Sequence, residues 1–136
     1  MSAASDYLED KLLDHSLGNT AFTQPSTLYL ALFTASTGLE SNAIGSASEI
    51  SNSGTAYSRQ TISFGAASSG TASNSATVTF NAATANWGTV SHIAIMDSGT
   101  AGSGNILYWG AVTTSKTIET NDTFQVSSGN LSISLA

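Results

Sequence analysis

Few residues of this 136-residue chain are of types that do acid–base or metal chemistry. It has two histidines, nine Asp or Glu residues, three Lys or Arg residues and no cysteine. His92 would be a general base, but it lies in an apolar run and no partner is visible in the sequence. A core or edge histidine bonded to a backbone carbonyl is therefore the favoured interpretation. His15 follows Asp14 on a predicted helix, where adjacent residues do not face each other, so the two form no dyad.

The common catalytic and ligand-binding motifs are missing from the sequence. No serine stands in G-x-S-x-G, and Gly102-Ser103-Gly104 lacks the Lys-Ser/Thr of a phosphate loop. Asp97 has the position of a residue that starts a turn. Trp87 and Tyr108-Trp109 would serve as platforms for sugars, although aromatic residues more often fill a sandwich core. We therefore expect no catalytic residue, no metal and no cofactor, and a small hydrolase is the weakest alternative.

Composition narrows the range of partners. The formal net charge of −6 opposes direct contact with nucleic acid. Only 9% of the residues are charged, against about a quarter in ordinary domains, so Ser, Thr, Gly and Asn must supply the polar surface. No apolar run approaches the roughly 20 residues that span a membrane, and the first residues do not resemble a signal peptide. The absence of cysteine fits assembly in a reducing cytoplasm.

Residues 5–17 predict the one clear helix. Ser5 or Asp6 would cap it, two leucine pairs spaced by four residues (Leu8/Leu12 and Leu13/Leu17) form a broad apolar face, and Gly18 follows where a helix ends. A helix this short must dock, either on its own β domain or on a neighbouring chain. We expect a helical segment over residues 1–20 and a β-sandwich domain over residues 21–136.

From residue 27 onward, apolar residues alternate with a period of two. The run 27–34 is apolar on both faces, which predicts a central strand covered on both sides. Further strand patterns occur at 59–64, 75–80, 90–97, 106–112, 116–119, 123–126 and 130–135. Short strands separated by turn residues favour an all-β fold, a jelly-roll-like antiparallel β-sandwich that carries the N-terminal helix.

Residues 35–56 form a long polar stretch with scattered apolar residues, including Leu39, Ile44 and Ile50. Connections of this length are uncommon unless they are functional or mobile. We expect that the stretch cannot bury enough apolar surface alone, and that it becomes ordered only against a partner.

Several short segments occur in a distinctive order along the chain. They are LLDH and GNT within 12–20, TLYLALFT at 27–34, YSR at 57–59, FGAA at 64–67, ATANWGTVSH at 83–92, LYWGA at 107–111, DTF at 122–124 and LSI at 131–133. Together they resemble a group of small tailed-phage virion proteins, labelled tail-fibre-like or head-decoration proteins. Size and organisation are also similar to jelly-roll capsid cement proteins of short-tailed phages. The resemblance covers nearly the whole chain and implies a structural role in the virion.

Within that role, we favour a capsid cement or decoration protein that bridges neighbouring capsomers on the outer capsid surface. Its expected partners are further copies of itself, as a dimer or trimer, and the major capsid protein, with no direct nucleic acid and no membrane. The alternative is a tail-fibre or baseplate component with receptor-glycan binding, which an exposed Trp87 or Trp109 beside Asp or Asn would favour. The expected contact residues are Leu8, Leu12, Leu13, Leu17, Leu39, Ile44, Ile50, Leu131, Ile133 and Leu135.

Overall fold

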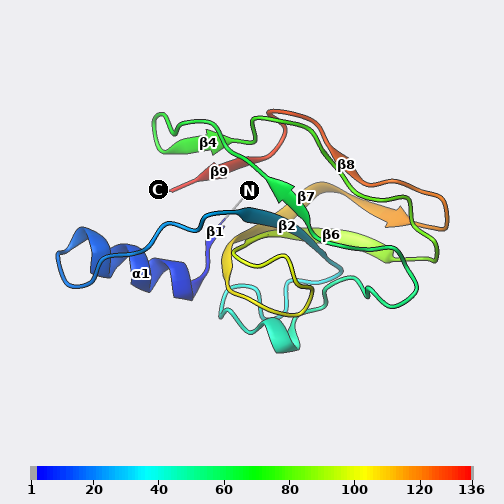
Figure 1. Ribbon diagram of the computed structural model, residues 1–136, viewed down its shortest axis with the longest axis horizontal. Coiled ribbons are helices and arrows are strands. Elements are labelled where there is room, and N and C mark those ends of the chain that lie inside the picture. The colour runs from blue at the N-terminus through cyan, green and yellow to red at the C-terminus, as the bar shows by residue number, and fades with distance from the viewer. Residues whose placement is uncertain (1–2, 136) are drawn as a thin grey trace.

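The computed structural model describes residues 3–135 and is built on one antiparallel five-stranded sheet (Figure 1). Its strand order is β1 (Ala3–Ala4), β7 (Ile106–Ile118), β6 (Gly88–Met96), β2 (Leu28–Phe33) and β3 (Gln60–Ile62). Two short ladders form the opposite layer: β4 (Thr71–Ser73) pairs with β9 (Ser132–Ser134), and β5 (Val78–Thr79) pairs with β8 (Gln125–Val126). The helix α1 (Asp6–Ser16) precedes the sheet, and a single 3-10 turn, η1 (Ile44–Ser46), lies in the loop after β2.

The predicted all-β class with one N-terminal helix is confirmed. All strand pairs are antiparallel, as the alternating pattern indicated. The jelly-roll order stays a prediction, because two separate ladders stand where a second continuous sheet would lie. Three strands differ from the prediction: β1 lies within the expected helical segment, β4 occupies residues 71–73, where no strand was expected, and β7 joins the runs 106–112 and 116–119 into one strand.

The sheet has a core on each face, and β2 contributes to both. Leu30, Ala31, Leu32 and Phe33 are completely buried, which confirms the prediction from their two-faced apolar pattern. Leu30 and Leu32 face the first core, between the sheet and the two ladders. Ala31 and Phe33 face the second core, on the other side of the sheet.

Residues from the long polar stretch cover that second core. Leu39 is completely buried there, and Ile50 is buried in the first core. Backbone bonds pin the stretch to β2, from Thr34 N to Ser48 O (3.0 Å) and from Ile50 N to Leu32 O (3.1 Å). The expectation that this stretch lacks enough apolar surface to fold alone is therefore wrong, because a few well-spaced apolar residues suffice when the sheet supplies the complementary surface.

The conformation of this stretch is tightly specified. At Gly38 the backbone has φ of +76°, and a Cβ atom would lie 2.7 Å from the carbonyl oxygen of Ala43, so only glycine fits. Asn42 also has a positive φ, which asparagine tolerates best after glycine. Its side chain accepts a hydrogen bond from Ile106 N (2.8 Å) and donates one to Asn105 Oδ1 (3.0 Å). These hydrogen bonds attach the stretch to the start of β7.

A bulge in the β6–β7 pair shifts the simple alternation. Val90 pairs with Lys116 and His92 pairs with Ala111, so residues 112–115 of β7 lie opposite Ser91 alone. Val90 consequently packs in the first core, whereas strict alternation places it on the face of His92 and Ala94. From its strand pattern at 90–97 the sequence predicts that Val90 and His92 share a face, and this is wrong because the bulge changes the side to which the strand points.

The start of the chain is joined to the sheet. Ala3 and Ala4 pair with Trp109 and Tyr108 of β7, and the Ser5 hydroxyl donates to Ile106 O while accepting from Leu8 N. Ser5 is thus the helix N-cap, as predicted, and Gly18 follows the helix with φ of +79°. Leu8 packs against Ala4 and Leu107, so α1 docks on its own sheet through its first turns. The division of the chain at residue 20 stays a prediction.

A buried ion pair links the loops at one end of the sheet. Arg59 donates from Nε to Glu49 Oε2 and from Nη2 to Glu49 Oε1, both at 2.8 Å. The Arg59 side chain is completely buried and that of Glu49 is 7% exposed. Arg59 Nη1 donates to the carbonyl oxygens of Ser98 (2.7 Å) and Ser103 (2.8 Å) in the β6–β7 hairpin loop, which therefore depends on the pair.

Two further donors complete the coordination of Glu49. The hydroxyl of Tyr57 donates to Glu49 Oε2 (2.7 Å) and accepts from Leu32 N (3.1 Å). Gly102 N donates to Glu49 Oε1 (2.9 Å). Together these bonds tie the polar stretch, β2 and the hairpin loop into one network. Burial, and next the Glu49 carboxylate, raise the pKa of Tyr57 well above its ordinary value.

Replacing Glu49 with Gln should lower the free energy of unfolding by about 3–5 kcal/mol, because Arg59 would remain buried without its counter-charge. Urea denaturation measures the loss, and amides such as Ile50 N should exchange faster by hydrogen exchange. The exposed Glu119→Gln is the matched control and should stay within about 0.5 kcal/mol of wild type. Similar stabilities of the two variants would contradict the structural role of the pair.

Stability should also fall steeply above pH 10. Below that pH the Tyr57 phenol keeps its proton in both states, whereas at higher pH the unfolded chain releases it and the folded chain does not. The free energy of unfolding then decreases with pH, by up to about 1.4 kcal/mol per pH unit for this group. Tyr57→Phe should be less stable at neutral pH and show a flatter alkaline decline. An unchanged alkaline slope would disprove the assignment.

Candidate functional site

Neither histidine is placed for catalysis. His92 Nδ1 shares a hydrogen bond of 2.8 Å with Ser91 Oγ, and its ring lies 6.3 Å from that of Trp109. It is half-buried on β6, a strand paired on both sides, and its partner is a side-chain hydroxyl and not the expected backbone carbonyl. His15 Nδ1 accepts from Phe22 N (3.1 Å) on the outer surface. Residues 3–135 contain no group of three His, Cys, Asp or Glu side chains that could hold a metal ion.

Two other features of the described chain bear on its chemistry. Asp97 accepts hydrogen bonds from Asn105 N (2.7 Å) and Asn105 Nδ2 (2.9 Å), so its predicted use as a turn residue is confirmed. Within residues 3–135, no helix is both long and apolar enough to span a bilayer.

The tryptophans are packing residues. Trp87 is 6% exposed, its Nε1 donates to Thr55 O (2.8 Å), and its ring meets those of Tyr57 and Phe80 edge to face. Trp109 packs against the second core. The expectation that aromatic side chains fill the core is therefore confirmed for Trp87, and the exposed sugar platform that would favour glycan binding is not present there.

The ten predicted contact residues separate into two groups. Leu8, Leu39, Ile50 and Ile133 are buried by the protein's own residues and offer no surface to a partner in this conformation. Leu12, Ile44 and Leu131 are half-buried. Leu13, Leu17 and Leu135 are the exposed large hydrophobic side chains of the described residues. A contact role for these last three stays a prediction.

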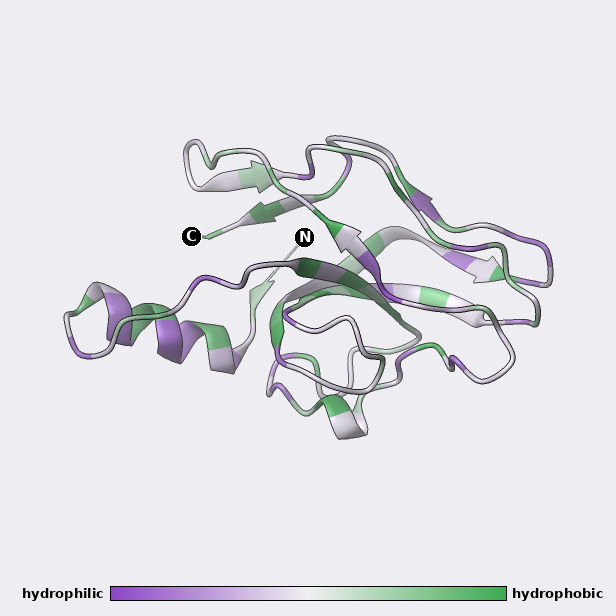
Figure 2. Ribbon diagram, in the orientation of Figure 1, coloured by the Kyte–Doolittle hydropathy of each residue, from purple (hydrophilic) through white to green (hydrophobic). Residues whose placement is uncertain are grey.

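Two of the exposed leucines form the tip of α1. Leu13 is 56% and Leu17 is 78% exposed, because the helix docks through Leu8 and its second half extends away from the body (Figure 1). Apolar and hydrophilic segments alternate along the helix, with the acidic residues between the leucines (Figure 2). We call Leu13 and Leu17, with the flanking Asp10 and Asp14, the helix tip.

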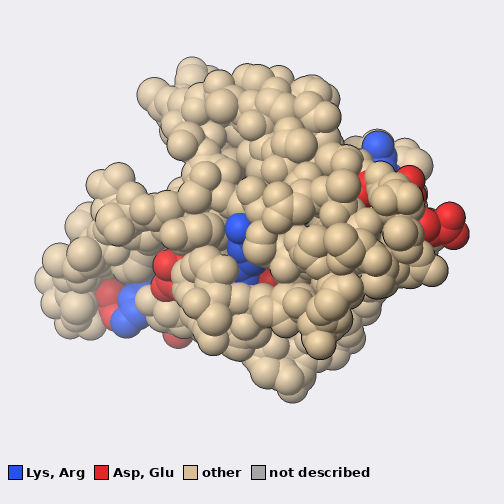
Figure 3. Space-filling model, turned by 45° about the vertical axis from the view of Figure 1, so that its right-hand side comes forward, with Lys and Arg blue, Asp and Glu red and all other residues tan. Residues whose placement is uncertain are grey.

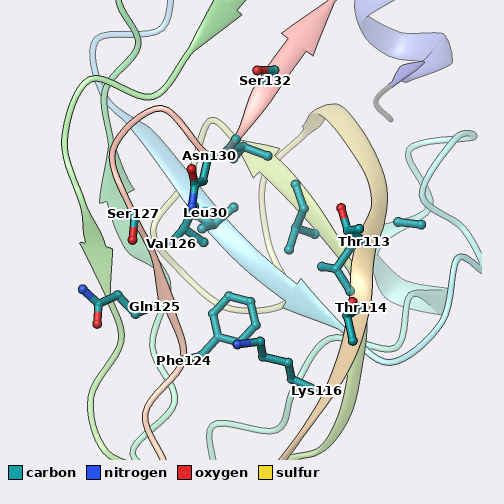
Figure 4. Close-up of a pocket in the computed structure, with 14 residues that line it drawn as sticks. Leu30, Thr113, Thr114, Lys116, Phe124, Gln125, Val126, Ser127, Asn130 and Ser132 are labelled. Carbon is teal, nitrogen blue, oxygen red and sulfur yellow. The ribbon is translucent and has the colours of Figure 1, made fainter.

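A cleft opens on the first-core face of the sheet, between β7 and the segment 124–132 (Figure 4). Its volume is about 540 Å³. Its floor consists of side chains that belong to or pack against the first core, namely Leu30, Ile93, Phe124 and Leu131. The bulge at residues 112–115 shapes one wall, because it turns β7 out of register beside the floor.

The rim of the cleft is polar. Figure 4 shows Thr113 and Thr114 on β7 lying across the cleft from Val126 and Asn130. The rim side chains Thr113, Thr114, Lys116, Gln125 and Asn130 are exposed and make no hydrogen bond or ion pair to another side chain within residues 3–135. Apolar floor and unused polar rim together form a surface suited to contact with another molecule.

Lys116 is the available cation at this cleft. Arg59 is committed to Glu49, and Lys11 lies 5.7 Å from the centre of the Tyr7 ring, whereas Lys116 has no charged or aromatic partner in the described part of the chain. Much of the face shown in Figure 3 carries neither charge. A single ammonium at a half-apolar cleft is therefore a distinctive electrostatic feature of this protein.

Comparison with known proteins identifies the family. A family model described as Podophage GP4 fiber I protein gp80 matches residues 3–134. The chain belongs to this family. It is therefore a tailed-phage virion structural protein, as the resemblance of its segments indicated. No curated protein matches the chain.

The cleft was not predicted from the sequence of this fiber-family protein. Phe124, Thr113 and Lys116 lie in segments that read as ordinary strands, and a cleft arises only when residues distant in sequence meet. The one local signal was the break in apolar alternation between Val112 and Ile118, which the bulge explains. The Glu49–Arg59 pair was also missed, since nine residues of irregular loop lie between its members.

Leu8 and Leu17 should respond differently to replacement by alanine. Leu8→Ala should lower the free energy of unfolding by about 2–5 kcal/mol, because it removes a buried side chain between α1 and β7. Leu17→Ala should change it by less than about 0.5 kcal/mol, because that side chain is exposed. Denaturant titration of both variants measures the difference. Equal, small effects would mean that α1 does not dock on its own sheet.

Proposed function

We propose that the protein is a structural subunit of a fibre on the tail of a short-tailed phage. The observation that carries the proposal is the match of the fiber-protein model to residues 3–134, nearly the full chain. The printed family name favours the tail-fibre alternative over the capsid cement role that the sequence first suggested. Attachment to capsomers and to the major capsid protein has no comparable support.

The proposed role is mechanical and not enzymatic. The histidines are accounted for by local hydrogen bonds, and the buried ion pair Glu49–Arg59 holds loops together. The polar, weakly charged surface suits close packing against neighbouring virion proteins, since few charges must be desolvated on contact. The helix tip and the cleft are the surfaces that we propose for those contacts, and receptor-glycan binding is left out because Trp87 is buried.

The number and place of the copies on the virion test this role. Quantitative mass spectrometry of purified particles should give a small number of copies per virion, set by the symmetry of the tail. Antibody labelling in electron micrographs should mark the tail. Hundreds of copies with label over the whole shell would refute the fibre role and support capsid cement. The major capsid protein provides the internal standard for copy number.

A further inference from the structure

We propose that the helix tip of one copy of this chain inserts into the cleft of a second copy, so that protomers associate head to tail. The knob is formed by Leu13 and Leu17, and the receiving surface is the cleft, where the half-buried apolar side chains are Val112, Val126 and Leu131. This contact goes beyond the proposed fibre role and does not depend on it, because it is a property of the purified chain.

Apolar complementarity supports the pairing. The helix tip presents two leucines that are more than half exposed, and the cleft presents the half-buried Val112, Val126 and Leu131 above its buried floor. The cleft's volume of about 540 Å³ lies in the range of roughly 300–1,000 Å³ that holds molecules of drug size, which is ample for two leucine side chains. Insertion would therefore remove Leu13 and Leu17 from water, together with the half-buried apolar side chains of the cleft.

Charge complementarity selects a second copy as the occupant. Asp10 and Asp14 flank the leucines, and the C-terminal end of a helix adds partial negative charge. Lys116 at the cleft rim is the free cation of the described residues. Copies of a chain with a net charge of −6 repel one another overall, whereas this contact joins opposite charges.

The geometry requires two molecules. Figure 1 shows α1 extending from one end of the long axis, while β8, which lines the cleft, lies toward the other end. A tip cannot fill the cleft of its own chain in this conformation. Because knob and cleft are different surfaces, the contact is heterologous, and it produces a closed ring or a continuing row of protomers.

Complementing variants test the contact in solution. Leu13→Gln with Leu17→Gln removes the knob, and Lys116→Glu with Asn130→Glu makes the cleft rim repel the helix acids. All four sites are exposed, so both variants should melt as wild type does. In analytical ultracentrifugation, wild type should self-associate, and each variant should associate about tenfold more weakly or not at all. An equimolar mixture should form a one-to-one dimer, because one intact knob and one intact cleft remain.

A charge exchange and a matched control sharpen the result. Asp10→Lys should weaken self-association, and combining it with Lys116→Glu should restore it in part, if these residues approach each other. Leu135→Gln removes an equally exposed leucine outside the contact and should leave association unchanged. A wild-type chain that stays monomeric across the concentration range, or a mixture of the two variants that stays monomeric, overturns the proposal. If the Leu13/Leu17 variant loses association and the Lys116/Asn130 variant does not, the proposal is also overturned, because the leucines would then bind a surface other than the cleft.

Discussion

The buried pair between Glu49 and Arg59 is the interaction on which much of the rest depends. Three segments without regular structure meet at it: the stretch after β2, the turn before β3 and the hairpin loop between β6 and β7. In a chain with so few charges, this fully hydrogen-bonded ion pair joins the three segments to one another, in addition to the apolar contacts of Leu39 and Ile50. Leu39 and Ile50 can then stay in their separate cores, and the second face of the sheet stays covered.

The residues that the sequence placed well are those whose pattern is local. Interactions between residues close in sequence determine four such features, and the structure confirms them. They are the cap at Ser5, the end of the helix at Gly18, the burial of both faces of β2 and the turn role of Asp97. The failures involve distance along the chain. Glu49 and Arg59 meet across irregular backbone, and the cleft joins β2 to residues near 130. No periodic pattern in the sequence therefore predicts the ion pair or the cleft.

The bulge opposite Ser91 affects both the packing of the first core and the shape of the protein surface. On β6 it moves Val90 into the first core, where it packs with Ile93. On β7 it sets residues 112–115 aside as a polar wall, which interrupts the edge of the sheet with Thr, Ser and Lys116. Irregular, charged edges resist unspecific strand pairing. The bulge therefore both hinders strand pairing at the sheet edge and shapes the cleft beside it.

Low charge and unequal ends together bear on how copies of this protein would assemble in the proposed fibre. A fibre needs repeated contacts that tolerate close approach, and a surface of hydroxyls and amides lowers the electrostatic cost of that approach. Direction must then come from a few distinct features. Here a leucine tip with acids lies at one end and an apolar cleft with Lys116 lies toward the other, so identical subunits are unlike at their two ends. A contact between unlike ends can be repeated from subunit to subunit in one direction. A self-complementary patch would instead stop assembly at a dimer.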